Sequence, residues 1–188
     1  MHSIFRRSSL LFCVLQSISL ALGTNFLNFS ENANDLALGR HPSVGGSLVV
    51  NPSLIKQDHD SPIFFVNSGN WYGDISISGL NYVHKIGNFN NRLFLKQAEI
   101  NDLEFRGPEP SDEPNAMFSA YAFQLGSGFS VKNELGDFGV SVSYLSIGIY
   151  DQTSKGFILD LGYSKLLLNG WNMGLSVLNI GHITKLYQ

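Results

Sequence analysis

Long stretches of this chain alternate between apolar and polar or small side chains, and Phe118 to Lys132 is the clearest of them. Its odd-numbered positions are mostly bulky and apolar, whereas its even-numbered positions are mostly small or polar. The period of two continues through Gly126 and Gly128, which predicts one long β-strand. Strands of soluble domains are usually about five or six residues long, whereas about 9–11 residues of tilted strand cross a bilayer. This stretch therefore has the length and the two-faced character of a strand in a membrane β-barrel.

The same alternation, with its turn signals, predicts seven strands in all. They span Pro62–Asn67, Gly73–His84, Arg92–Leu103, Ala116–Lys132, Phe138–Tyr150, Gly156–Leu167 and Trp171–His182. Compact turns containing Gly and Asn are expected at 85–91, 133–137 and 168–170, and they alternate in chain order with longer or more polar connections at 104–115 and 151–155. Short turns at one end and longer loops at the other are typical of an up-and-down barrel.

The predicted fold is therefore all-β, an antiparallel up-and-down transmembrane β-barrel of which this chain supplies about seven strands. Seven is odd, and single-chain bacterial barrels are even-numbered and begin at eight strands. We therefore expect that the chain is C-terminally truncated or that it assembles with another chain. The longest loop, Glu104–Asn115, carries three prolines and several acids and is expected to face outside and to contact partners.

Particular residues sharpen the prediction of two faces. A charged side chain is costly in lipid, so Asp160 is predicted to face the barrel lumen, and Gln124 is placed there by its position on the polar side of its strand. In Phe138–Tyr150 and Gly73–His84 the apolar side changes partway along, which predicts a β-bulge in each, or burial of both faces as in a sandwich. Aromatic girdles at the two membrane interfaces are expected to include Trp71, Tyr72, Tyr150, Trp171 and Tyr187.

The N-terminal part of the chain differs from the rest. Arg6 and Arg7 precede an apolar stretch that ends at Ala21-Leu22-Gly23, which predicts a signal peptide over residues 1–23, with an uncleaved membrane anchor as the alternative. Residues 24–60 are polar and irregular, apart from a helical turn at Ala33–Leu38. We expect residues 24–60 to form a periplasmic or plug-like segment, and residues 61–188 to form the barrel strands.

Composition narrows the classes of function. The only cysteine, Cys13, lies in the predicted signal peptide, so neither a disulfide nor a thiolate metal site is expected afterwards. Without Arg6 and Arg7 the chain has 10 basic and 15 acidic residues, a net charge of −5, which argues against a nucleic-acid partner. No stretch after residue 23 approaches the roughly 20 apolar residues of a membrane helix. A membrane protein of this composition would cross with strands.

Residue patterns that indicate catalysis or ligand binding are missing from the sequence. The five histidines are scattered without metal-ligand spacing, and His59, between Asp58 and Asp60, fits a solvated polar loop better than a ligand cluster. There is no nucleophile elbow, phosphate loop or dinucleotide fingerprint. Asp151 and Asp160 are a weak candidate for an acid pair. No catalytic, metal or cofactor residue is predicted, and we expect that the protein is not an enzyme.

Ala37-Leu38-Gly39 is followed by Asn51-Pro52-Ser53-Leu54, and further short motifs come after them along the chain. Taken in order, these motifs resemble those of the PorV/PorQ family of outer-membrane proteins, and the first two are similar to its N-terminal pattern. Later strands resemble the family's Gly-Phe-Ala-Leu-Asp-Leu-Gly strand, here with Asp160, and its following strand ending in Asn-Ile-Gly, here with Asn179 and Gly181. The similar stretches are Phe118–Tyr121, Gly139–Leu145, Gly156–Gly162 and Gly174–Gly181. The sequence departs from the family in two ways. Arg40 stands where the family has a second glycine, and family members continue for many residues after the last of these strands, whereas this sequence ends at Gln188.

The resemblance implies a barrel related to fatty-acid transporters, with about twice as many strands, in the outer membrane of a Gram-negative bacterium. It also implies association with the type IX secretion system, whose secreted cargo proteins and other components would be the partners alongside outer-membrane lipid. The family-motif residues Asn51, Pro52, Asp160, Asn179 and Gly181 are expected to act structurally, with Asn51-Pro52 fixing the entry of the N-terminal segment. Two alternatives are an outer-membrane transporter of hydrophobic solutes and a secreted soluble β-sandwich.

Overall fold

The computed structural model describes residues 24–30, 33–37, 39, 50–55, 61–71, 74–108, 112–167 and 170–184. The predicted signal peptide, the histidine flanked by Asp58 and Asp60, and the girdle candidates Tyr72 and Tyr187 lie outside the described residues.

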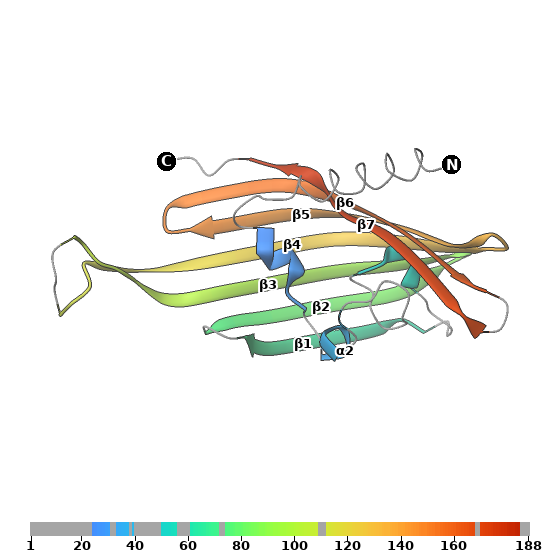
Figure 1. Cartoon of the computed structure of the whole chain (residues 1–188), viewed down its shortest axis with the longest axis horizontal. Coiled ribbons are helices and arrows are strands. Elements are labelled where there is room, and N and C mark those ends of the chain that lie inside the picture. The colour runs from blue at the N-terminus through green and yellow to red at the C-terminus, as the bar shows by residue number, and fades with distance from the viewer. Residues whose placement is uncertain are drawn as a thin grey trace, which may run out of the picture.

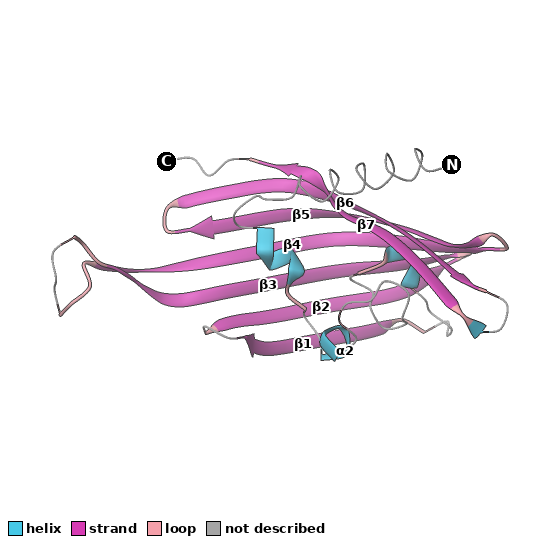
Figure 2. Cartoon of the chain, viewed as in Figure 1, coloured by secondary structure: helices cyan, strands magenta, loops and turns pink. Residues whose placement is uncertain are grey.

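Seven antiparallel strands form one up-and-down sheet in the order of the chain (Figures 1 and 2). The strands are β1 (Ile63–Trp71), β2 (Ile75–Ile86), β3 (Phe89–Phe105), β4 (Ala116–Asn133), β5 (Gly136–Ile149), β6 (Gln152–Leu166) and β7 (Asn172–Ile183). They contain between 9 and 18 residues each, so every strand is long enough to cross a bilayer. The all-β, antiparallel, up-and-down prediction and all seven predicted strands are confirmed. The sheet is not closed, because β1 and β7 are its two edges.

In the described part of the chain, three short helical segments precede the strands and lie on one side of the sheet (Figure 1). They are the 3-10 helix η2 (Thr24–Asn28), the α-helix α2 (Ala33–Ala37) and the 3-10 helix η3 (Pro52–Leu54). α2 confirms the helical turn predicted at Ala33–Leu38. The side of the sheet that contacts η2 and η3 is called the inner face, and the opposite side is called the outer face. Within the described ranges, no helix has the length and hydropathy needed to cross a membrane.

The inner face at one end of the sheet is apolar because η2 covers it. Phe26 and Leu27 of η2 pack on a cluster of buried side chains from five strands. These are Ile77, Ala98, Ala122, Leu145 and Ile158. The cluster explains why the predicted bulges in Phe138–Tyr150 and Gly73–His84 are wrong: neither β2 nor β5 shifts register. Their apolar side changes because the inner face is buried at the η2 end, while the outer face is apolar further along each strand.

Bulges occur instead in β3 and β7. The pairing of β3 with β4 shifts between Ile100 and Leu103, where Asp102 has a φ of 58°. The pairing of β6 with β7 shifts between Leu159 and Leu161, and Asn179 on β7 has a φ of 61°. A bulge bends its strand and increases the local twist. In Figure 1 β7 runs diagonally across the front of the sheet, at an angle to β1–β5.

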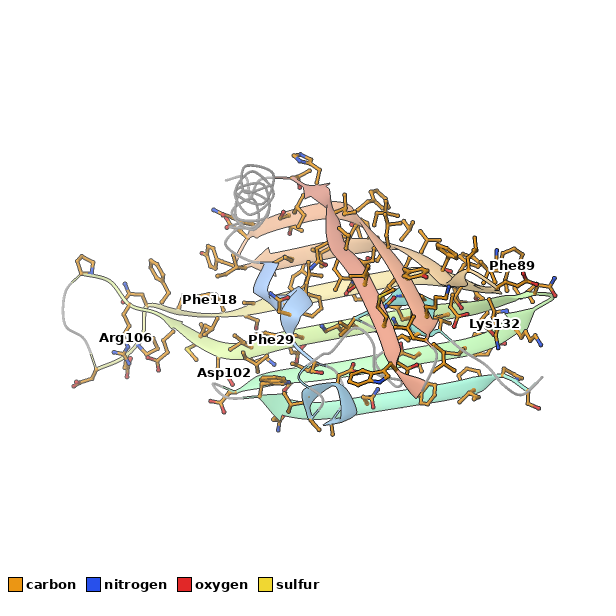
Figure 3. The ribbon with its side chains drawn as sticks, turned by 45° about the vertical axis from the view of Figure 1, so that its right-hand side comes forward. Phe29, Phe89, Asp102, Arg106, Phe118 and Lys132 are labelled. Atoms are coloured by element: carbon orange, nitrogen blue, oxygen red, sulfur yellow. The ribbon has the colours of Figure 1, made fainter. Side chains whose placement is uncertain are left out.

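Two further expectations need correction. The polar connection predicted at 151–155 is wrong, because β6 begins at Gln152 and only Tyr150 and Asp151 join it to β5. Residues 152–155 extend the sheet because they pair with the end of β5, and Lys155 N–H also donates to Thr184 Oγ1 at 2.9 Å. The β3–β4 connection is long, as predicted, and it projects beyond the other strands, with Arg106 at its base (Figure 3).

Trp71 does not belong to an outward girdle. Its ring faces the inner side and stacks on Phe29, with ring centroids 5.4 Å apart. Phe29 directly follows η2, which holds it at this end of the sheet. Trp71 is therefore partly buried by the N-terminal segment. Tyr150 and Trp171 are 71% and 73% exposed and lie at opposite ends of the strands. Both residues therefore lie at strand ends, as predicted.

Candidate functional site

The outer face is covered by large apolar side chains on all seven strands. The strand register places them on the same side of the sheet, and each is more than a third exposed. They include Phe64, Val66, Leu80, Ile86, Leu93, Leu125, Phe129, Phe138, Val140, Val142, Phe157, Leu161, Leu175 and Val177. Monomeric soluble proteins rarely expose a contiguous apolar patch of more than a few hundred Å². Exposed apolar side chains on all seven strands are therefore unusual for a monomeric soluble protein.

Charged side chains bound this apolar surface at its two ends. On β6, Lys155 and Lys165 lie on the outer side, and the outward positions between them are Phe157, Leu159, Leu161 and Tyr163. The ten residue steps from Lys155 to Lys165 cover roughly 33 Å of strand, which corresponds to roughly 23 Å of membrane depth at a tilt of about 45°. The apolar band of outer-membrane barrels is about 25 Å tall. The outer face therefore matches a bilayer in height as well as in chemistry.

The inner face holds the segment Asn51–Ile55 in a fixed position. Asn51 caps η3, since its Oδ1 accepts from Ser53 N–H at 3.0 Å and from Ser53 Oγ at 2.7 Å, and Pro52 occupies the first helical position. Asn51 Nδ2 donates to the carbonyl oxygen of Tyr163 on β6 at 3.1 Å. Ser130 Oγ on β4 donates to the Ile55 carbonyl oxygen. The predicted entry role of Asn51-Pro52 thus corresponds to a capped turn that is tied to two strands.

Glycines make room for this segment. A Cβ on Gly139 would lie 2.2 Å from Pro52 C and from Ser53 N, and a Cβ on Gly162 would lie 2.1 Å from Asn51 Oδ1. No ordinary side chain fits at such distances, so these two positions of β5 and β6 form a recess that only glycine provides. Gly139 and Gly162 face each other in the register of the two strands. We call these two glycines and Ser130 the seat of the N-terminal segment.

Asp160 lies beside the seat, on the inner face of β6. Its carboxylate is buried and accepts from Ser141 Oγ at 2.9 Å and from the backbone N–H of Asn179 at 2.7 Å. The second bond satisfies a donor that the β7 bulge frees from the ladder. Gly181 follows this bulge closely, and a Cβ there would lie 2.1 Å from the carbonyl oxygen of Phe157. The predicted residues Asp160, Asn179 and Gly181 therefore act together to fix β7 against β6.

Gln124, the other predicted lumen residue, also lies on the inner face. It is buried and donates from Nε2 to Ser143 Oγ at 2.9 Å. Asp160 instead bonds to Ser141 and Asn179, so the structure does not join the two predicted lumen residues into one site. Within the described ranges, no group of three or more His, Cys, Asp or Glu side chains is placed to hold a metal ion.

Two buried cations on β3 were not predicted from the sequence. Lys96 is 1% exposed and donates from Nζ to the carbonyl oxygens of Phe26 at 3.0 Å and Phe29 at 2.5 Å, which holds η2 to the sheet. Arg92 donates from Nε to Asn81 Oδ1 at 2.7 Å, and its guanidinium lies 4.2 Å from the centroid of the Phe94 ring. Both could have been predicted by the argument used for Asp160, because each is a charged residue on the inner side of an alternating strand.

Replacing Asp160 by asparagine is expected to destabilise the protein by about 1–3 kcal/mol, because the amide cannot accept both hydrogen bonds as a carboxylate does. Urea unfolding in detergent micelles, followed by tryptophan fluorescence, measures the change. Ser141→Ala is the matched control, since it removes one of the two bonds and leaves the carboxylate on the Asn179 N–H, at a cost of about 1 kcal/mol. Equal midpoints for Asp160→Asn and wild type would show that this carboxylate does not stabilise the β7 bulge.

Comparison with known proteins gives no relative from which a role can be transferred. No protein-family model, curated protein or solved structure matches this chain.

Proposed function

We propose that this protein is a non-enzymatic outer-membrane β-barrel protein of the PorV/PorQ type, in which the seven strands form part of the barrel wall. Its role would be to handle or attach proteins that a type IX-like system secretes. The observation that carries the membrane part of the proposal is the outer face, where exposed apolar residues on all seven strands are bounded by Lys155 and Lys165. This face supports the proposal because the lipid-contacting surface of a barrel is an apolar band of similar height.

The proposed PorV/PorQ family rests on the order of the sequence motifs. Residues of these motifs also form hydrogen bonds that hold distant parts of the chain together. Asn51 and Tyr163 are 112 residues apart in the chain and are joined by a hydrogen bond, while Asp160 and Asn179 are joined by another. The inner face is covered by the N-terminal segment and is polar away from η2, and together with the apolar outer face it fits a barrel whose N-terminal segment lies inside it. The projecting β3–β4 hairpin, with exposed Glu104 and Arg106, is the natural place for contacts with proteins outside the membrane.

Sodium carbonate extraction tests the membrane part. We expect the protein, expressed with its full sequence in a Gram-negative host, to stay in the outer-membrane pellet at alkaline pH, because its apolar outer face is held by lipid rather than by charge. A periplasmic soluble protein of the host serves as the control that leaves in the wash. Release of the protein with this control would contradict the barrel and favour a soluble β-sandwich. Saturable fatty-acid binding by the purified protein would instead favour the solute transporter.

A further inference from the structure

A polar side chain, His84, interrupts the apolar outer face on β2. The outward positions along the apolar part of this strand are Leu80, Tyr82, His84 and Ile86. Ile86 lies between His84 and the β2–β3 turn and is 54% exposed, so His84 lies within the apolar surface and not at its margin. Ionisable side chains are rare inside a membrane-contacting surface, and they usually mark a functional contact there.

The imidazole of His84 has an unsatisfied nitrogen. Its Nδ1 is buried and has no hydrogen-bond partner among the described residues. The residue opposite it, Asn91, is bonded within the sheet instead, since its Nδ2 donates to Ser127 Oγ and to the Gly128 carbonyl oxygen, both at 3.2 Å. A neutral imidazole has one N–H and one lone pair, and buried N–H groups are rarely left without an acceptor. We therefore assign the proton to Nε2, the distal nitrogen, which places an N–H donor on the outer side of this half-buried ring.

Two aromatic rings continue from His84 across the outer face. The ring centroid of Tyr82 lies 4.8 Å from that of His84, and the ring centroid of Phe64 on β1 lies 4.7 Å from that of Tyr82. We call Phe64, Tyr82 and His84 the ring row. The Tyr82 hydroxyl can both donate and accept a hydrogen bond. The ring row therefore presents a donor and an acceptor side by side within an apolar surface.

We infer that the ring row is the centre of a contact between two copies of this chain, in which His84 Nε2–H of each copy donates to the Tyr82 hydroxyl of the other. This step rests on the proposed membrane function and adds an assembly state to it. A two-fold axis along the membrane normal keeps both copies in the same orientation and brings identical surfaces together at the same depth. Because the rings of Tyr82 and His84 lie against each other, their polar groups have similar depths, and each copy supplies the partner that the other lacks.

Hydrogen-bond complementarity favours a second copy over the other occupants of this surface. Lipid tails contain no acceptor, so lipid would leave both nitrogens of His84 without a partner. A different protein would need its own donor and acceptor at the matching positions, whereas a second copy provides both by symmetry. Hydrogen bonds between side chains of this kind strengthen association within membranes.

Cross-linking between single cysteines in phospholipid vesicles tests this contact. The full chain with Cys13→Ser and Leu80→Cys is reconstituted at increasing dilution in lipid and treated with a short bis-maleimide. We expect a cross-linked dimer, since Leu80 lies on the outer face beside Tyr82 along β2. In the control, Val177→Cys on β7 replaces Leu80→Cys. We expect no dimer from it, because β7 lies at the opposite edge of the sheet.

His84→Leu and Tyr82→Phe, each combined with Leu80→Cys, are expected to lower the dimer association constant roughly tenfold, because either change removes both symmetric hydrogen bonds. The double variant should be no weaker than either single variant, since donor and acceptor belong to the same bonds. Tyr163→Phe is the matched control. Tyr163 also lies on the outer face, but its hydroxyl donates to the Leu135 carbonyl oxygen within the chain at 2.8 Å, so the change should leave dimerisation as it is.

Circular dichroism of each variant verifies that the sheet is intact. A chain that stays in the vesicles as a monomer at every lipid ratio would overturn the contact and leave the membrane function standing, with lipid covering the ring row. Additive losses from His84→Leu and Tyr82→Phe would also overturn it, because they would show that these two groups do not bond to each other. A chain that does not enter vesicles would overturn the membrane function and this contact together.

Discussion

Replacing Gly139 by valine is expected to displace Asn51–Ile55 from the inner face. The new side chain would collide with backbone atoms of Pro52 and Ser53, and backbone cannot move aside as the end of a flexible side chain can. Val50, Leu54 and Ile55 are all buried by this docking. Losing the burial of two of these three costs about 3–6 kcal/mol in total, at roughly 1.5–3 kcal/mol each. This is a large share of the stability of a typical domain.

Hydrogen exchange in detergent measures the displacement of Asn51–Ile55, and urea unfolding measures the loss of stability. Amides of residues 50–55 should lose their protection in Gly139→Val, and the urea midpoint should fall. Gly69→Val is the matched control, because Gly69 also lies on a strand, and a Cβ there would meet no atom within 4 Å. We expect it to leave both measurements close to wild type. If the two valine variants have the same exchange pattern, Gly139 does not form a seat for the N-terminal segment.

The strands were predictable from the sequence because their alternation is a local signal. Each of the seven has a stretch in which every second side chain is apolar, and the bilayer-scale length of Phe118–Lys132 is visible in the sequence alone. What the sequence did not reveal is which partner covers each inner position. Leu145 and Ile77 looked like a change of register because the residues that bury them, Phe26 and Leu27, lie far away in the chain.

The seat shows the same limit. The glycines of β5 and β6 are visible in the sequence on alternating strands, but the sequence does not show what they accommodate. Their actual reason is a backbone segment from the N-terminal part of the chain, joined to β6 by the Asn51–Tyr163 hydrogen bond across 112 residues. A contact of that separation leaves no local pattern. The capped turn at Asn51-Pro52, in contrast, has a local signal in the sequence, because an Asn cap followed by Pro is a typical helix start.

The buried charges Arg92 and Lys96 on the inner face could have been predicted from the sequence. Asp160 was assigned to the inside because a charge in lipid is costly, and the structure places it on the inner face. Arg92 and Lys96 occupy the same side of β3 at a spacing of four, and the same argument applied to them. Both are buried and bonded to oxygen atoms, one of a side chain and the other of the main chain. These three buried charges mark the inner face although they are not of one sign, whereas Lys155 and Lys165 lie on the outer side near the ends of β6.

An arginine at the middle of the outer face is expected to distinguish a membrane protein from a soluble one by the size of its effect on the free energy of unfolding. Val142 is 51% exposed, lies midway along β5 and pairs with Leu159, near the midpoint between Lys155 and Lys165. In a bilayer, Val142→Arg places a charge near the midplane, which costs about 2–4 kcal/mol. In a soluble sheet the same half-exposed position would change stability by only about 0.5 kcal/mol and would improve solubility.

Met173→Arg is the matched control for depth. Met173 also lies on the outer face, but it pairs with Lys165 at the end of the apolar surface, where arginine costs only about 0–1 kcal/mol in a bilayer. Both variants are refolded into phospholipid vesicles, and urea titrations give the free energy of unfolding in each case. A difference of about 2 kcal/mol or more between the two positions follows from the depth dependence of charge in lipid. Equal, near-zero effects would mean that the outer face does not contact lipid, and the proposed membrane function would fail with it.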